Sequence, residues 1–136
     1  MPHISSNVSC PISSEQEKEL KTKLGKAISI LSRKSERWLM LSFHDNCRIY
    51  FAGDNSKPSA FIEVQVLGKI NPNESSALSA EICNIFEDTL SISPDRIYIK
   101  YEEVQNPACG SSVRRSVRLH GEGDGDGGEI FLFRPR

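Results

Sequence analysis

The chain repeats one helical pattern at a fixed distance, and this repeat constrains its fold more than any other feature. Three apolar residues at helical spacing recur 62 positions later: Leu20, Leu24 and Ile28 in the first copy, and Ile82, Phe86 and Leu90 in the second. An extended segment precedes each copy and a short apolar segment follows it. The sequence therefore predicts two successive β-α-β units.

The first unit is predicted from its caps and apolar segments. Residues 2–8 form a short extended start, and Ser14 with Glu17 has the spacing of a capping box that begins a helix. An apolar strand is predicted over 38–43 and a second short strand over 48–52. Turn-forming residues separate these two strands, so the sequence predicts a hairpin here.

The second unit has clearer boundaries. Apolar and polar residues alternate over 59–67, which is the pattern of a half-buried strand. Asn71 can cap a helix whose first position is Pro72. The breaker at 93–95 ends that helix before a strand over 96–101.

Right-handed crossovers make the two strands of each unit parallel, and a shared core requires both helices on the same face. The predicted fold class is α/β (α+β), a four-stranded mixed sheet with two helices on one face. The other face stays uncovered, although Phe61, Leu67 and the segment 48–51 are apolar or aromatic. Large exposed apolar faces usually mark interfaces, so we expect oligomerisation through the open sheet.

Composition limits the classes of partner. The chain has 136 residues, enough for one domain, and a net charge of -1, which gives no reason to expect nucleic acid or anionic membrane as a partner. It has no apolar run long enough to span a membrane and no secretory signal pattern, so we expect a cytoplasmic protein. The four cysteines lack the spacing of a metal site and are predicted to be free thiols, with no cofactor.

Pro2 is a candidate for chemistry because an initiator Met before a small residue is normally removed. Its secondary amine would then be free, and α-amino groups titrate at about pKa 8, against about 10.4 for lysine. A proline at a chain terminus is more often merely tolerated there. The rest of the chain has to decide between the two interpretations.

Five segments in order along the chain carry a family resemblance: Pro2, "SNV" at 6–8, "RKSERWLM" at 33–40, "LGKI" at 67–70 and "SISPDRIYIKY" at 91–101. Together they resemble the macrophage migration inhibitory factor family of the tautomerase superfamily, in particular its microbial homologues. The resemblance covers about residues 2–103. It implies two β-α-β units per chain and assembly as a homotrimer.

The resemblance also implies an activity and a site. The activity is that of a keto-enol tautomerase, similar to phenylpyruvate tautomerase, on small α-keto carboxylates with Pro2 as general base. Lys34 matches the lysine that anchors the substrate, although both of its neighbours differ from the family's Gly-Lys-Pro. Leu67 takes the place of the residue that presents a backbone N–H to the substrate. Tyr98 matches a pocket tyrosine that the adjacent subunit supplies, and Lys100 replaces the family's asparagine.

The residue types suit this chemistry. A base must take a proton from the carbon beside the carbonyl, and the substrate carboxylate needs a nearby cation, from Lys34 or else from Arg33 or Arg37. Taken alone, cations after a helix usually interact with its C-terminal end, and Tyr98 in an alternating strand usually packs. The joint pattern favours a site.

The sequence leaves a second class of function open beside the tautomerase. The chain could be a cytokine-like or binding protein of the same fold with a vestigial pocket, secreted without a signal peptide and acting on an unidentified receptor. Turnover of an aryl pyruvate discriminates between the two classes.

The resemblance predicts a tautomerase domain over 1–104. The composition of 105–136 predicts a flexible tail, in which the apolar segment 130–133 could dock on the domain.

Overall fold

A computed structural model describes residues 2–105 of the chain, so the predicted tail lies outside the described residues apart from Gln105. The strands are β1 (His3–Val8), β2 (Met40–His44), β3 (Ala60–Leu67) and β4 (Ile97–Val104). The helices are α1 (Ser14–Ala27) and α2 (Pro72–Leu90), and three short 3-10 turns are η1 (Ile28–Ile30), η2 (Glu36–Trp38) and η3 (Pro94–Arg96).

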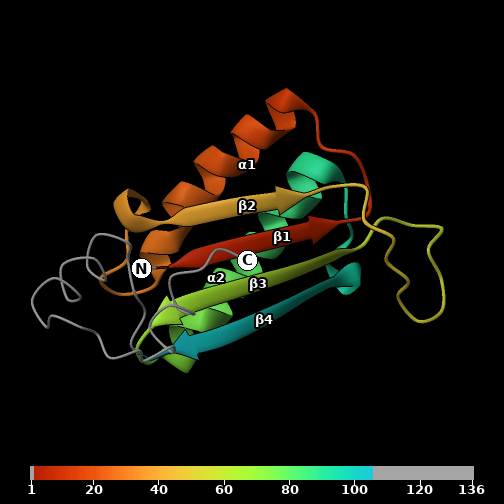
Figure 1. The fold of residues 1–136 in the computed structure, drawn as a ribbon. Helices are drawn as coiled ribbons and strands as arrows, with labels where there is room; N and C mark the ends of the chain where they lie inside the picture. Colours follow the sequence, from red (N-terminus) through yellow and green to blue (C-terminus); the bar gives the residue numbers. More distant parts are fainter. Residues whose placement is uncertain (1, 106–136) are drawn as a thin grey trace, which may run out of the picture. The chain divides into compact units, whose positions relative to one another are not determined.

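The four strands form one mixed sheet in the order β2-β1-β3-β4. β1 is parallel to β2, β3 is parallel to β4, and the two pairs meet where β1 runs antiparallel to β3. Each parallel pair is connected through one helix, and both helices lie on the same face of the sheet (Figure 1). The two predicted β-α-β units and the predicted fold class are therefore confirmed.

The capping box of α1 lies one residue earlier in the chain than predicted. The Ser13 hydroxyl accepts from the Gln16 backbone N–H at 3.1 Å, and the Gln16 side-chain oxygen accepts from the Ser13 N–H at 2.9 Å. Ser14 and Glu17 therefore do not form the box. The same glutamine donates to the Thr89 carbonyl at 3.2 Å, so the contact with α2 helps to select this cap.

The helix α2 begins as predicted. The Asn71 side-chain oxygen accepts from the backbone N–H of Asn73 at 2.8 Å, with Pro72 in the first helical turn. The helix ends at Leu90, and the C-cap residue Ser91, whose φ of 59° is left-handed, turns the chain back toward the sheet. Sequence reasoning located this element well because cap and breaker are both local signals.

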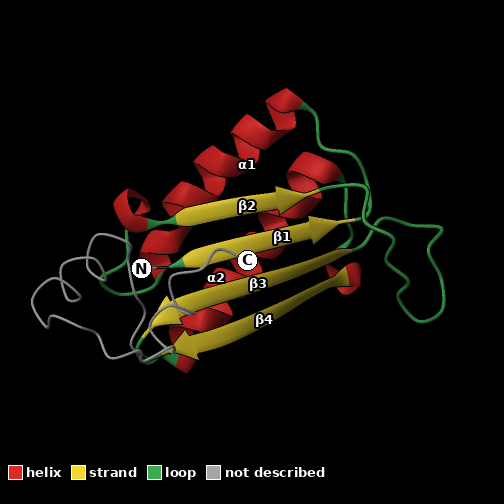
Figure 2. Cartoon of the chain, viewed as in Figure 1, coloured by secondary structure: helices red, strands yellow, loops and turns green. Residues whose placement is uncertain are grey.

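The two helices cover one face of the sheet (Figure 2), and buried residues of the helices and strands form one hydrophobic core. All six residues of the repeated helical pattern are buried there, the most exposed being Leu90 at 7%. β3 contributes its inward-facing residues Ile62, Val64 and Val66. The period that predicted the helices therefore also identified their packing face. None of the helices in the described part of the chain is both long and apolar enough to cross a bilayer.

The predicted hairpin after β2 does not form. Asn46 donates its backbone N–H to Cys10 at 3.1 Å, and Cys47 donates to Val8 at 2.9 Å. The chain therefore continues alongside the end of β1 and does not turn back along β2. Within 48–52 only Phe51 makes an isolated bridge, and its partner lies in the same loop.

The open face of the sheet is less apolar than predicted. Alternation along the strands places eight polar side chains over its centre: His3, Ser5, Asn7, Ser42, Glu63, Gln65, Lys100 and Glu102. The large exposed apolar side chains lie at strand ends and in loops: Trp38, Met40, Tyr50, Phe51, Leu67 and Tyr98. The expectation of an apolar face is therefore wrong for the centre and right only at the ends.

Candidate active site

Pro2 is buried at the entrance to β1, directly before the first strand residue. Its carbonyl accepts a hydrogen bond from the Met40 backbone N–H at 3.0 Å, which ties it to β2. The pairing of His3 with Gln65, extended by one step, places Pro2 opposite Val66 near the end of β3. Pro2 is thus held between the start of one strand and the end of another.

Lys34 and Leu67 meet at this same end of the sheet. The Lys34 ammonium donates to the Leu67 carbonyl, with 3.4 Å between nitrogen and oxygen. Gly68 directs its own backbone N–H toward β4, where it bonds Val104 at 3.1 Å. Because successive peptide groups of a strand face opposite edges, the Leu67 N–H faces the β1 side, where Pro2 lies. The structure therefore brings together three of the four predicted site residues.

The loop that carries Lys34 is anchored to the start of α2. The Glu74 carboxylate accepts from the Ser32 hydroxyl and, at 3.1 Å, from the Ser32 backbone N–H. These two bonds, the hydroxyl bond first, lower the pKa of Glu74. The backbone makes a tight turn around Arg33, which has a left-handed φ of 65°. The Lys34 N–H closes this turn by donating to the Leu31 carbonyl at 3.1 Å.

Trp38 is a candidate binding residue that sequence reasoning missed. It lies two positions before Met40, which bonds Pro2, and 56% of its surface is exposed. The Arg37 guanidinium lies 5.0 Å from the centre of its ring. An exposed indole flanked by a cation suits an aromatic carboxylate, and the signal available in the sequence was a lone tryptophan inside a charged segment.

Tyr98 lies at the opposite end of the sheet. It pairs with Phe61 near the start of β3, five positions from Val66, or about 17 Å at ~3.3 Å per residue. Its ring stacks on that of Phe61, with centroids 5.5 Å apart, and it is 63% exposed. The neighbouring Lys100 ammonium lies 3.9 Å from the Glu63 carboxylate. One chain therefore does not bring Tyr98 to Pro2.

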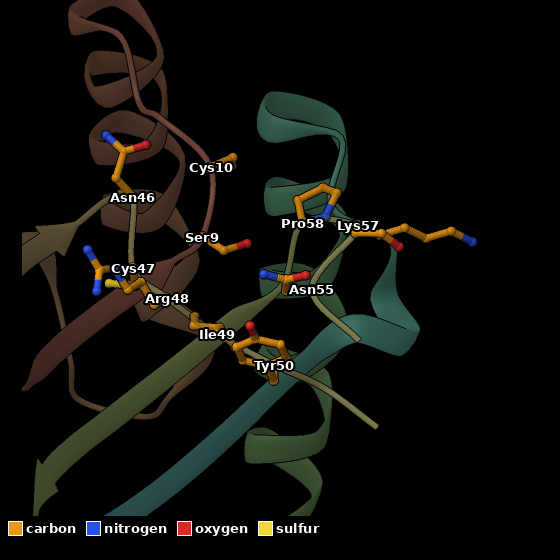
Figure 3. Close-up of a pocket in the computed structure, with 11 residues that line it drawn as sticks. Ser9, Cys10, Asn46, Cys47, Arg48, Ile49, Tyr50, Asn55, Lys57 and Pro58 are labelled. Atoms are coloured by element: carbon orange, nitrogen blue, oxygen red, sulfur yellow. The ribbon is translucent and has the colours of Figure 1, made fainter. Parts of the chain in front are cut away.

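A hollow of about 560 Å³ also lies at this far end, among the residues that follow β1 and β2 and precede β3 (Figure 3). Its lining is polar and apolar in about equal parts and includes Arg48, Tyr50 and Lys57 but none of the predicted site residues. Burial raises the pKa of the Cys10 thiol in its wall. No group of three or more potential metal ligands occurs within residues 2–105.

Comparison with known proteins identifies the family of the chain. The family model described as macrophage migration inhibitory factor matches residues 1–113. The chain belongs to the macrophage migration inhibitory factor family. A relative of that name from Meriones unguiculatus is 30% identical over 104 residues, covering 76% of this chain and 89% of the relative.

Solved structures of the macrophage migration inhibitory factor family agree with this assignment. The homologue from Prochlorococcus marinus superposes with a TM-score of 0.68 at 27% identity, covering 81% of this chain and 96% of that one. Leishmania major MIF2 superposes with a TM-score of 0.71 at 24% identity, covering 76% and 89%. The family resemblance read from the five segments is confirmed, and with it the fold.

Proposed function

We propose that the chain is a keto-enol tautomerase for small α-keto carboxylates of the phenylpyruvate type, with Pro2 as general base. The observation that carries the proposal is the convergence of Pro2, Lys34 and Leu67 at one end of the sheet. The role of each follows from its chemistry.

Pro2 supplies a base only after Met1 is removed, because a peptide bond takes up the nitrogen lone pair. Burial disfavours the protonated form of an amine, and a nearby ammonium such as that of Lys34 acts in the same direction. Both effects lower the pKa of this amine below the usual value of about 8 for an α-amino group. The free amine then takes a proton from the carbon beside the ketone, and the protonated amine gives a proton to the ketone oxygen, which becomes the enol hydroxyl while the amine is free again.

The other two residues bind and polarise the substrate. The Lys34 ammonium retains donors beyond its long bond to the Leu67 carbonyl, and these suit the substrate carboxylate. The Leu67 N–H is directed toward the Pro2 side, where it can donate to a substrate oxygen that gains negative charge. Trp38 offers an apolar surface for an aryl group.

The site is completed by a second copy of the chain. Tyr98 is exposed on a strand end far from its own Pro2, so it can serve only the Pro2 of a neighbour. We therefore include in the proposal a homotrimer in which Tyr98 of each copy faces the adjacent site, in keeping with closed cyclic assembly.

One structural neighbour supports the substrate class. The protein Pt0534, which superposes with a TM-score of 0.72 at 14% identity, covering 81% of this chain and 93% of that one, was crystallised inactivated by 2-oxo-3-pentynoate. That compound is itself a 2-oxo carboxylate. The chemistry named for the neighbour therefore coincides with the class proposed for this chain.

The test is turnover of an aryl pyruvate, followed by the change in ultraviolet absorption between enol and ketone. Mass spectrometry first verifies that Met1 is absent. Pro2→Gly should lower kcat/KM by about 10² to 10⁴, the usual span for a general base, and a form that retains Met1 should be inactive. Pro11→Gly changes an exposed proline after β1 and should keep full turnover.

A pH profile sharpens the test. The kcat/KM of the Met-free protein should rise with pH and level off as the amine loses its proton, with the midpoint below the usual α-amino value of about 8. Undiminished turnover by Pro2→Gly or by the Met1-retaining form contradicts the role of Pro2. Absence of turnover by the Met-free protein favours the alternative, a binding or cytokine-like protein with a vestigial pocket.

A further inference from the structure

Four polar side chains on the open face form a continuous hydrogen-bonded series, here named the cross-sheet chain: Ser42, His3, Gln65 and Glu102. The Ser42 hydroxyl lies 3.0 Å from His3 Nε2, and His3 Nδ1 lies 3.0 Å from the Gln65 side-chain oxygen. The Gln65 side-chain nitrogen donates to Glu102 at 2.9 Å. One member comes from each strand, so the series spans the whole sheet.

The carboxylate at one end sets the direction of every bond. An ionised Glu102 only accepts, so the Gln65 amide nitrogen points toward it and the Gln65 oxygen faces His3. That oxygen also only accepts, so His3 Nδ1 must carry a proton. In the neutral ring Nε2 then accepts from the Ser42 hydroxyl. The cross-sheet chain thus selects the Nδ1–H tautomer, the less populated one for histidine in water.

His3 directly follows Pro2, so whatever fixes the His3 ring also fixes the peptide that carries the terminal amine. The first residues of a chain fray unless they are tied down. Besides the strand pairing, Pro2 has the bond from Met40 to its carbonyl, and the His3 ring adds side-chain contacts to the strands on both sides. The cross-sheet chain therefore holds the start of β1 to both neighbouring strands, directly beside the terminal amine. This holding of β1 is called the clamp below.

We infer that His3 is a positioning residue: the cross-sheet chain holds its ring between β2 and β3 and so keeps Pro2 aligned with Lys34 and Leu67. It acts through Pro2 and does not touch the substrate. Its effect on turnover rests on the proposed function, whereas its tautomer and its effect on the order of β1 do not.

The tautomer is read by nitrogen-15 NMR of histidine side chains in the full chain, with the His3 signals assigned by their loss in His3→Asn. In the neutral ring, wild-type protein should show Nδ1 protonated and Nε2 unprotonated. Glu102→Gln removes the fixed acceptor, so the Gln65 amide can reverse and the two tautomers should mix. Glu63→Gln, on the same face but outside the series, should leave the tautomer unchanged. A wild-type ring protonated on Nε2 overturns the inference.

The positioning role is tested by breaking the series at its middle. Gln65→Met keeps the shape and removes both bonds, and it should speed hydrogen exchange of the His3 and Ile4 amides. It should also lower kcat about tenfold with KM little changed, since small misplacements of reacting groups cost rate. Asn7→Ala, farther along β1 on the same face, removes a bond to Phe61 and should leave kcat unchanged.

The outcomes separate the two proposals. Unchanged amide exchange in Gln65→Met overturns the clamp, whether or not the protein turns over a keto acid. Faster exchange with unchanged kcat in a protein whose Pro2→Gly variant is inactive overturns the positioning role. If the Met-free wild type lacks turnover, the proposed function fails while the tautomer and exchange measurements still decide the clamp.

Discussion

The two ends of the sheet are built for different purposes. At the Pro2 end, a buried proline, the Lys34 ammonium and the Leu67 peptide converge. At the Tyr98 end, an exposed aromatic pair faces outward beside a loop that Arg96 holds through bonds to Asp54 and to the residues before β3. The Pro2 end brings polar functional groups together, whereas the Tyr98 end exposes aromatic side chains to solvent.

Under the proposed function, this difference means that a single chain carries only part of the site. The proposed base Pro2 and its cation Lys34 are positioned by contacts within the chain. Strand pairing places Tyr98 about 17 Å away along β3, and no rotation of its side chain covers that distance. The two ends become one site only if they meet between copies.

The strongest test of this comparison mixes two defective variants. Pro2→Gly lacks the base and Tyr98→Ala lacks the aromatic, and we expect each alone to lose at least about 10²-fold and 10-fold in kcat/KM, respectively. In a randomly mixed homotrimer, about one quarter of the sites would combine an intact Pro2 with an intact Tyr98. Turnover should therefore recover on denaturing and refolding the variants together, as measured with an aryl pyruvate.

The control is the same pair refolded separately and then combined. If co-refolding gives only the sum of the two separate activities, Tyr98 does not act across an interface. Light scattering of the same samples should give about three times the 15.2 kDa chain mass. A monomer at micromolar concentration would contradict the shared site.

Local signals account for most of what the sequence predicted correctly. The repeat around Leu20 and Ile82 located both helices and their buried faces, because burial imposes the helical period on the sequence. The cap at Asn71 was equally local. Pro2 was a candidate from its position after the initiator Met, and the family resemblance, not the spacing of any residues, made it the base and added Lys34, Leu67 and Tyr98 to the site.

The errors come from contacts distant in sequence. The predicted hairpin does not form because the backbone N–H groups of Asn46 and Cys47 bond the end of β1 and the residues after it. No local sequence pattern indicates these bonds. The polar centre of the open face was missed because His3 and Gln65 are 62 residues apart and satisfy each other only once the strands pair. The hollow near Arg48 arises in the same way, from three separate segments.

At the Tyr98 end, Arg96→Ala should cost stability. The guanidinium donates to the carbonyls of Asp54 and Pro58 and to the Ser59 hydroxyl, at 2.8 to 3.3 Å, while its side chain is only 11% exposed. Its loss leaves these acceptors unsatisfied, at about 2 to 3 kcal/mol of unfolding free energy for charged hydrogen bonds. Urea denaturation measures this. Arg48→Ala, an exposed arginine of the same loop, should change stability little.

At the Pro2 end, Lys34→Ala should instead affect binding. Losing one charged hydrogen bond of about 1.4 kcal/mol to the substrate carboxylate raises KM about tenfold, with kcat less affected if the contact is equal in ground and transition states. Lys57→Ala removes an exposed lysine at the far end and should leave KM unchanged. Equal effects of the two lysine variants would mean that only overall charge matters, and not the geometry of the Pro2 end.

The smallest expected effect concerns Glu74, which anchors the Lys34 loop. Hydrogen bonds from the Ser32 hydroxyl and N–H lower the pKa of Glu74 in the folded protein below its ordinary value of 4.5. A lowered folded pKa means that ionised Glu74 stabilises the fold above the unfolded pKa and that this contribution disappears as the pH falls through the folded value. Glu74→Gln should therefore be less stable than wild type at pH 6, and this difference in unfolding free energy, the stability gap, should close on acidification below about pH 4.

Urea midpoints across this pH range measure the gap. In a Ser32→Ala background, the pH-dependent part of the gap should shrink. A gap that stays constant with pH in both backgrounds would show that the Ser32 bonds do not favour the charged carboxylate, and the anchoring of the Lys34 loop would then have to come from the Lys34 and Leu31 backbone bond alone.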